Sequence, residues 1–281
     1  MSSKDNIFGA YYYEDLLPEN VFGHTKKITL FRKVIERARY GAPTNSLRIL
    51  DIGCGSGHAV TRFLGRVGDE VLGIDLFPPN IEYAESRYKK VGLNFICQDV
   101  NKLSFNGKIF DIVVLADILE HVTDVKTVLK DAAKLLAPNG RILITVPNGR
   151  GPFEIESSLS RAPYLGRLMI KFVDCIVAVL NKTIFKGAWS RAADVLPVDL
   201  PYNIDSGHVQ FFSKHEIIRL ISETGLQVVD MHNLSFLSGP FTNYFFTPWQ
   251  SFCRWNTHVA YSLPHWAASA WFFECKKLRN G

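Results

Sequence analysis

The feature that most constrains the fold of this chain is the segment LDIGCGSGH at residues 50–58. Arg48, Ile49, Leu50 and Ile52 read as the end of a parallel strand, and three glycines follow at once, Gly53, Gly55 and Gly57. Glycines at a turn remove every Cβ, so a ligand can lie directly against the main chain. The segment therefore predicts a strand, a tight turn and a nucleotide-type ligand at the carboxyl end of the strand.

The glycine spacing and one acid separate this turn from the common dinucleotide site. The dinucleotide fingerprint is GxGxxG and directs a helix N-terminus at a pyrophosphate, whereas here the spacing is GxGxG and Asp51 stands two residues before Gly53. A carboxylate would repel a pyrophosphate but attract an ammonium group. S-adenosylmethionine carries such a group and is the ligand we expect. NAD, or a turn that has lost its ligand, are the alternatives.

Acidic residues also follow the next three expected strands. Asp75 ends VLGID about 20 residues beyond the glycines, where a carboxylate can accept both ribose hydroxyls. Asp99 follows the third strand at the height of an adenine amino group, and Asp117 follows the fourth. Asp75 could instead be a helix N-cap and Asp99 a loop residue. The spacing of these acids relative to the glycines favours a cofactor-binding role for them over these two alternatives.

Taken in order, these segments resemble class I S-adenosylmethionine-dependent methyltransferases. The resemblance is greatest to the small-molecule branch, which includes ubiquinone-biosynthesis O-methyltransferases and bacterial glycan and lipid methyltransferases. It covers residues 25–150 and returns at 207–218 and 270–277. It implies an α/β fold, a Rossmann-like seven-stranded sheet with six parallel strands and one antiparallel strand, the seventh strand lying between the fifth and sixth.

The resemblance also implies which residues hold the cofactor. They are Asp51, Gly53 and Gly55 for the methionine end, Asp75 for the ribose, Leu76 or Phe77 for the adenine face, Asp99 with Val100 for the adenine edge, and Ala116 with Asp117 beside the sulfonium and the acceptor.

Alternating helix and strand patterns predict one elaborated α/β domain. We expect helices at 25–40, 57–66, 79–90 and 123–136, strands at 47–52, 70–75, 94–98, 109–115, 140–146, 226–234 and 270–277, and a capping box from Ser213 and Glu216. The expected divisions are an N-terminal lid at 1–24, the cofactor-binding core at 25–147 and 203–281, a helical cap insertion at 148–202, and an aromatic-rich insertion at 237–266.

The two insertions are the parts that the family core would lack. Residues 164–180 read as an apolar helix with one narrow polar stripe, which should bury most of its circumference. The segment 237–266 is too rich in aromatic residues for an exposed loop. We expect the insertions to pack together. A second interpretation adds a groove for an apolar substrate, or contact of the locally basic segment 164–186 with an anionic membrane surface.

Histidines are the candidate proton acceptors. If the acceptor is an alcohol or a phenol, methyl transfer requires a base, and an imidazole titrates near neutral pH. His208 stands at the end of the cap, before Val209 and Phe211. His121 follows the fourth strand, and His24 follows the tyrosine-rich start. His121 could also only brace its turn. Asp117 completes the candidate catalytic set because it flanks the acceptor.

The order Asp117, Glu120, His121 resembles the acidic, acidic, histidine cluster proposed to hold a divalent cation in ubiquinone-type O-methyltransferases. Such a set would suit magnesium or manganese. However, Asp117 is shorter than the glutamate of that family, and adjacent residues on a helix point about 100 degrees apart. The sequence therefore favours a site without metal, in which Glu120 and His121 brace the fold.

These observations favour O-methylation of an apolar or lipid-linked small molecule, such as a quinone precursor or a glycolipid. N-methylation of an amino sugar or another small amine is the alternative, and a non-catalytic interaction protein with the same fold is the alternative from a different class. Residues 116–119 lack the Asn/Asp-Pro-Pro-aromatic pattern of nucleic-acid amino-methyltransferases, and the net charge is only +5. We therefore expect no nucleic-acid partner.

Composition bears on the compartment. The five cysteines are odd in number and show no CxxC spacing, which indicates reduced thiols. The first 20 residues lack an apolar signal core, and no run of 18 apolar residues occurs. We expect a cytoplasmic protein that can associate with a membrane surface.

Overall fold

The computed structural model describes residues 10–40, 45–99, 107, 109–162, 165–183, 201 and 207–278. Its seven strands form one sheet in the order β3-β2-β1-β4-β5-β7-β6. They are β1 (Arg48–Ile52), β2 (Glu70–Asp75), β3 (Leu93–Cys97), β4 (Phe110–Ala116), β5 (Leu136–Pro147), β6 (Leu226–Asn233) and β7 (Ala270–Lys277). Only β7 pairs antiparallel with its neighbours β5 and β6. The expected fold class is confirmed, including the place of the seventh strand.

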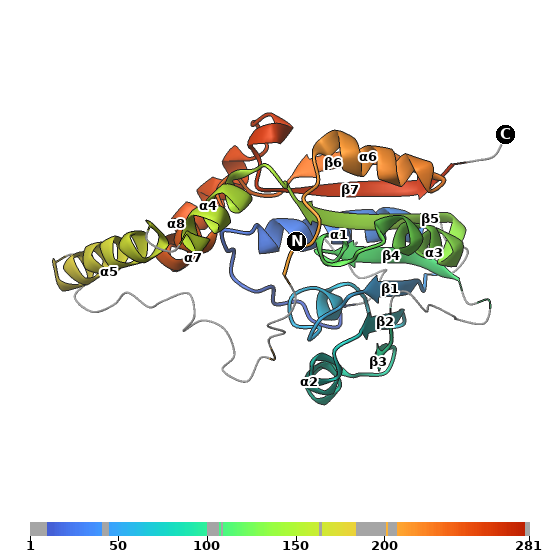
Figure 1. The fold of residues 1–281 in the computed structure, drawn as a ribbon. Helices are drawn as coiled ribbons and strands as arrows, with labels where there is room; N and C mark the ends of the chain where they lie inside the picture. The colour runs from blue at the N-terminus through green and yellow to red at the C-terminus, as the bar shows by residue number, and fades with distance from the viewer. Residues whose placement is uncertain are drawn as a thin grey trace.

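Helices cover both faces of the sheet (Figure 1). α1 (His24–Tyr40) and α2 (Pro78–Tyr88) share a core with Ile49, whereas α3 (Val125–Leu135) and α6 (Lys214–Glu223) share the other core with Leu50. Both residues are fully buried. Successive side chains of a strand point to opposite faces, so a strand covered on both sides needs apolar residues in a continuous run. This explains why the central strands could be located from sequence.

Two helix ends behave as expected from their residue types. Ser213 precedes α6, and its side chain accepts a hydrogen bond from the Glu216 backbone N–H at 3.3 Å. Gly225 follows α6 with φ +77°, a conformation that glycine adopts without a Cβ clash. The capping residue and the glycine therefore set the boundaries of this helix.

The helix expected at 57–66 is not formed. Only a single 3-10 turn, η1 (Thr61–Phe63), occurs there. The Thr61 hydroxyl donates to Asp51 Oδ2 at 2.7 Å, which ties this turn to the end of β1. Glycine and β-branched residues also have low helix propensity. A contact with the neighbouring strand therefore replaces regular helix here.

The two insertions contact each other at one end of the molecule. They form α4 (Pro152–Arg161) and α5 (Leu165–Thr183), and α7 (Pro240–Phe246) and α8 (Gln250–Val259). Glu156 on α4 accepts a hydrogen bond from the Thr242 backbone N–H at 2.9 Å, and the Tyr244 hydroxyl donates to Asp174 on α5 at 2.6 Å. α7 thus lies against both cap helices.

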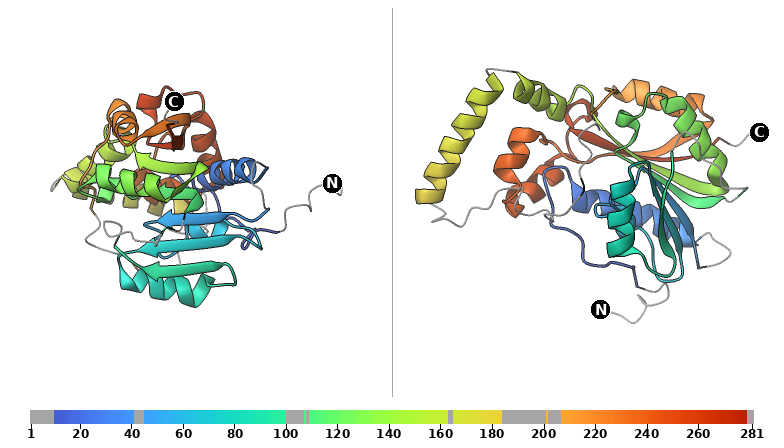
Figure 2. Two further views of the ribbon diagram at one scale, coloured as in Figure 1. Left: turned by 90° about the vertical axis from the view of Figure 1, so that its right-hand side faces the viewer. Right: turned by 60° about the horizontal axis from the view of Figure 1, so that its bottom comes forward.

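The expectation that the cap helix buries most of its circumference is wrong for its described part. α5 extends away from the sheet, as two views show (Figures 1 and 2). Leu168, Phe172 and Val179 are 65%, 65% and 54% exposed. They are spaced so that they share one helix face. The apolar pattern is therefore an exposed stripe, not a buried core.

A buried ion pair joins α1 to the start of β2 and yields a stability prediction. Both Asp69 oxygens accept from the Arg39 guanidinium at 2.7 Å, and both side chains are 1% exposed. We expect Asp69→Asn to lower the free energy of unfolding by about 3 kcal/mol, because it leaves a buried guanidinium without its full counter-charge. Urea unfolding followed by circular dichroism would measure this.

The surface pair Lys89–Glu85 provides the matched control, since both its side chains are at least 40% exposed. Glu85→Gln should change the free energy of unfolding by less than about 0.5 kcal/mol. Equal losses in the two variants would show that the buried pair has no special role.

Candidate functional site

The glycine turn after β1 leaves an open surface above the main chain. The Gly53 and Cys54 backbone N–H groups both donate to the Ile74 carbonyl, at 2.8 and 2.9 Å. A Cβ on Gly53 would lie 2.6 Å from Ile118, whereas one on Gly55 would have no neighbour within 4 Å. Gly53 is therefore required for close packing, and Gly55 faces the space where a ligand can lie.

Asp51 is a buried carboxyl with one unused oxygen. It is 1% exposed, and its Oδ2 accepts from the Thr61 hydroxyl. Within the part of the chain that the structure describes, Oδ1 has no hydrogen-bond partner. Burial raises the pKa of the Asp51 carboxyl to about 7. An ammonium group would supply both the missing donor and the counter-charge, so the site fits the amino-acid end of S-adenosylmethionine.

Asp75 links the glycine turn to the start of α2. Its Oδ2 accepts from the Gly55 N–H at 2.8 Å, and its Oδ1 accepts from the Phe77 N–H at 2.9 Å and from the Asn80 side chain at 3.2 Å. Phe77, not Asp75, occupies the N-cap position of α2. A carboxylate has about four acceptor positions, so Asp75 can still accept from ribose hydroxyls.

The remaining residues expected at the cofactor lie along the same edge with less distinctive surroundings. Leu76 is 65% exposed, as an adenine-stacking side chain without ligand would be. Asp99 and Ala116 are half-buried at the ends of their strands. Val100 lies outside the described residues. Their cofactor roles remain predictions.

Asp117, at the end of β4, is held in an unusual conformation by two partners. Its φ is +54°, in the left-handed region that aspartate tolerates better than most residues. Lys27 on α1 donates to Oδ2, and the Thr145 hydroxyl donates to Oδ1 at 2.7 Å. Partial desolvation would raise the pKa of the Asp117 carboxyl, whose side chain is 43% exposed, but Lys27 and Thr145 outweigh it and lower the pKa.

The ion pair with Lys27 makes Asp117 a poor proton acceptor. Lys27 itself was not recognised from the sequence. Lys27 lies 90 residues before Asp117 in the chain, and no local pattern marks it. Its side chain is only 11% exposed. Only the fold brings this lysine to the end of β4.

His121 and His208 lie together beyond the end of β4. Their ring centroids are 5.0 Å apart in an edge-to-face arrangement. The Val209 and Gln210 backbone N–H groups donate to the Glu120 carbonyl at 2.8 and 3.1 Å, which fixes the segment after the cap against the turn η3 (Leu119–His121). His208 Nδ1 is 2.8 Å from Glu154 Oε1 on α4.

His24 begins α1 and is buried. Burial lowers the pKa of its imidazole to about 4, and its Nε2 has no hydrogen-bond partner among the described residues. Its ring packs edge-to-face on Phe63 at 5.8 Å between centroids. A ring with so low a pKa is a weak base, so His208 and His121 are better placed than His24 to accept a proton.

The structure does not bring Asp117 into one metal-ligand set with Glu120 and His121, because Asp117 is paired with Lys27. Ligand atoms of Glu120, His121 and His208 do lie within 4.8 Å of one another. Burial raises the pKa of the Glu120 carboxyl well above its usual range. Two imidazoles and one carboxyl differ from the oxygen-rich sets that magnesium prefers. The metal-free site remains a prediction.

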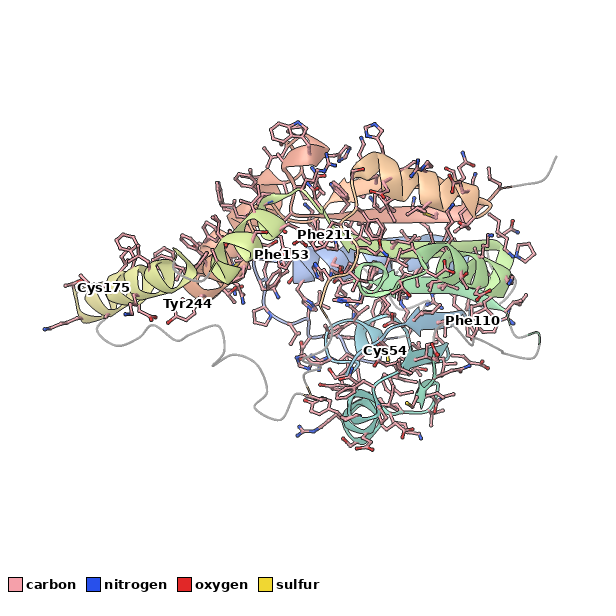
Figure 3. All side chains as sticks on the ribbon, in the orientation of Figure 1. Cys54, Phe110, Phe153, Cys175, Phe211 and Tyr244 are labelled. Atoms are coloured by element: carbon pink, nitrogen blue, oxygen red, sulfur yellow. The ribbon has the colours of Figure 1, made fainter. Side chains whose placement is uncertain are left out.

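Figure 3 marks the two ends of the sheet. Cys54 lies at the glycine turn with Phe153 and Phe211 toward the same end, and Phe110 marks the other end. A pocket of about 520 Å³ near that other end is lined by Arg37, Arg141 and Glu274 among others. Both arginines pair with Glu274, so we assign this pocket a structural role.

Comparisons with known proteins agree with this geometry. A sequence profile described as a methyltransferase domain matches residues 23–231. The ubiquinone biosynthesis O-methyltransferase of Azorhizobium caulinodans is 35% identical over 113 residues, which are 40% of this chain and 44% of that protein. The mitochondrial ubiquinone biosynthesis O-methyltransferase of Homo sapiens is 33% identical over 123 residues, 41% of this chain and 33% of that protein. The chain therefore spans less than half the length of these two relatives.

Among solved structures, magnesium protoporphyrin IX methyltransferase from Synechocystis PCC 6803, crystallised with bound SAH, superposes with a TM-score of 0.51. The match covers 95% of this chain and 91% of that chain at 15% sequence identity. At this identity the likeness shows the fold.

The raised pKa of Asp51 predicts pH-dependent cofactor binding. Because a carboxyl with a pKa of about 7 is protonated below that pH, an ammonium ligand loses its counter-charge as pH falls. We expect the affinity for S-adenosylmethionine to fall about ten-fold between pH 7.5 and pH 5.5. Calorimetry at several pH values would measure it. Asp51→Asn should bind weakly with a flat profile in this range, and an equally steep profile in that variant would contradict the assignment.

Proposed function

We propose, since the chain belongs to the methyltransferase-domain family, that it O-methylates an apolar or lipid-linked small molecule. Its family and its fold make it a class I S-adenosylmethionine-dependent methyltransferase. A phenolic quinone precursor is the acceptor class that the relatives' names favour. A glycolipid is the alternative within the same reaction type.

The observation that carries this proposal is the position of His208. The following residues, Val209 and Gln210, are hydrogen-bonded to Glu120, which lies four residues beyond the end of β4. His208 Nδ1 is engaged by Glu154, whereas within the described part of the chain its Nε2 makes no hydrogen bond, and the side chain is 21% exposed. An acceptor hydroxyl can therefore reach a free imidazole nitrogen beside the cofactor edge.

The proposed reaction is an in-line displacement. When bound, S-adenosylmethionine would supply an electrophilic methyl group, and the carbon–sulfur electron pair would stay with sulfur as an acceptor oxygen bonds to the carbon. Asp51 and Asp75 would hold the donor, and His208 Nε2 would take the proton that the acceptor oxygen loses. Asp117 stays ionised beside Lys27 and helps to orient the reacting groups. Alignment and exclusion of water account for most of the rate in such a reaction.

Aromatic side chains around His208 favour an apolar acceptor. The Phe153 ring lies 5.4 Å from the His208 ring, and Phe22 of the proposed N-terminal lid lies 6.4 Å from Phe153. Phe211 lies 6.4 Å from His208 and is 49% exposed. We propose that the described residues of the cap (148–162 and 165–183), of the aromatic insertion at 237–266 and of the lid (10–24) together bound the acceptor side.

We further propose that α5 brings the enzyme to an anionic membrane surface, where an apolar acceptor would reside. Its exposed stripe of Leu168, Phe172 and Val179 is accompanied by the exposed basic residues Lys171 and Lys182. A helix with an apolar face and cationic flanks lies in the plane of the interface. Across the described residues, no helix is long and apolar enough to cross a bilayer.

The base assignment predicts the effect of His208→Gln. With a prenylated catechol as acceptor, we expect kcat to fall by about 10²–10³, since a positioned general base contributes this much, while the KM for S-adenosylmethionine stays the same. His215→Gln on α6 is the control, because His215 is exposed. Full activity of His208→Gln toward the catechol would refute the assignment. Activity toward amines alone would favour N-methylation, and failure to bind the cofactor would favour a non-catalytic role.

The membrane proposal predicts loss of vesicle binding when the stripe is made polar. We expect the wild-type protein to co-sediment with vesicles that contain phosphatidylglycerol, and the triple change Leu168→Ser, Phe172→Ser, Val179→Ser to weaken binding at least about ten-fold. Val67→Ser with Val91→Ser is the matched control, because both valines are exposed on the body at 68% and 96%. Equal binding by the triple variant and the wild type would contradict the proposal.

A further inference from the structure

We propose that Glu154, in the first turn of α4, is the positioning residue that sets the ring tautomer of His208 and thereby makes Nε2 the proton acceptor. This inference rests on the proposed function, because it concerns the same base. Glu154 acts through His208 and does not itself touch the acceptor. The cap insertion would then contribute to the chemistry as well as to the shape of the site.

The hydrogen bond between the two side chains determines the tautomer. Glu154 Oε1 lies 2.8 Å from His208 Nδ1, and the glutamate side chain is only 8% exposed. An ionised carboxylate can only accept, so Nδ1 must carry the hydrogen. In a neutral imidazole with hydrogen on Nδ1, the lone pair is on Nε2. The nitrogen that faces away from Glu154 is therefore the basic one.

Other contacts prevent the ring from turning over. His121 packs on it edge-to-face at 5.0 Å between ring centroids, and Phe153 lies 5.4 Å away at 35°. The backbone just after His208 is fixed by the two hydrogen bonds that the Glu120 carbonyl accepts. The ring is thus held from three elements: α4, η3 and the segment that begins at residue 207.

The carboxylate also has an energetic role once the proton moves. When Nε2 takes the acceptor proton, the ring becomes an imidazolium with a buried carboxylate on its other nitrogen. Charge-assisted hydrogen bonds are roughly twice as strong as neutral ones. The same division of roles occurs wherever a carboxylate orients a catalytic histidine and stabilises its cationic form. Glu154 would therefore lower the barrier as well as select the tautomer.

A structural role for Glu154 is the competing explanation. An acid in the first turn of a helix interacts favourably with the helix dipole. A neutral side chain of the same size distinguishes the two roles. Glu154→Gln keeps the size of the side chain and a hydrogen-bond acceptor, but it removes the charge and adds an amide donor that can face Nδ1. It should therefore preserve α4 while allowing the other tautomer.

Glu156 provides a matched control on the same helix. Its carboxylate accepts from the Thr242 backbone and hydroxyl, and it bonds the cap to α7 instead of to a histidine. Glu156→Gln therefore removes an equal charge from α4 without removing the partner of His208. It should leave the His208 tautomer at its wild-type state, because Glu156 contacts Thr242 and not His208.

The experiment combines nitrogen-15 NMR of labelled histidine side chains, recorded near pH 8 where imidazoles are neutral, with steady-state kinetics. His208→Gln assigns the resonance by its disappearance. We expect the wild-type protein to show hydrogen on Nδ1 of His208, and Glu154→Gln to show a shift toward hydrogen on Nε2. With a prenylated catechol, Glu154→Gln should lower kcat at least about ten-fold with little change in KM.

Unchanged nitrogen shifts and unchanged kcat in Glu154→Gln would overturn the inference. If His208→Gln nevertheless loses turnover, the proposed base stands and only the role of Glu154 fails. If His208→Gln keeps full turnover, the proposed function of His208 fails, and the NMR spectra still decide whether Glu154 sets its tautomer. A melting temperature within a few degrees of wild type for Glu154→Gln would exclude unfolding of the cap as the cause of a loss.

Discussion

The parallel pairing of β1 with β2 and β4 is the constraint on which the site depends. This pairing places the carboxyl ends of three strands at one edge, and with them Asp51, Asp75 and Asp117. Three carboxylates so close together repel one another, and each is accommodated differently. Burial keeps Asp51 protonated up to about pH 7, Asp75 accepts from backbone N–H groups, and Asp117 pairs with Lys27. A cationic ligand completes this arrangement, because it supplies a counter-charge to the ionised Asp51 carboxylate and a donor for its unused oxygen.

The cofactor edge could be predicted because its residues belong to short segments with local signals. The glycine turn directly follows its strand, and the buried strands show as continuous apolar runs. The capping box of α6 is likewise a four-residue pattern. The turn at 57–66 was mispredicted as a helix because a side chain on the adjacent strand, Asp51, holds Thr61. This tertiary contact determines the conformation of the turn, and helix propensities calculated from the local sequence do not take it into account.

The acceptor side could be predicted only in part. His208 and His121 were candidates from residue type and order, but Lys27 and Glu154 were not recognised because their partners lie 90 and 54 residues away in the chain. The periodicity of α5 correctly predicted an apolar helix face, but it did not predict that this face is exposed. An amphipathic pattern gives the direction of an apolar face, and burial depends on neighbours that the pattern does not contain.

In the proposed site, the two sides thus hold different kinds of acid–base groups, and this division suits the proposed methyl transfer to an oxygen. On the cofactor side, the lowered pKa of Asp117 and its pairing with Lys27 keep its carboxylate from competing for the acceptor proton. On the proposed acceptor side, His208 Nδ1 contacts the buried Glu154 carboxylate, and within the described part of the chain its Nε2 makes no hydrogen bond. In the proposed reaction, the acceptor proton therefore goes to His208 and not to Asp117. Since that base is built from the cap and the segment after it, changes in the insertion can alter the acceptor without disturbing the cofactor edge.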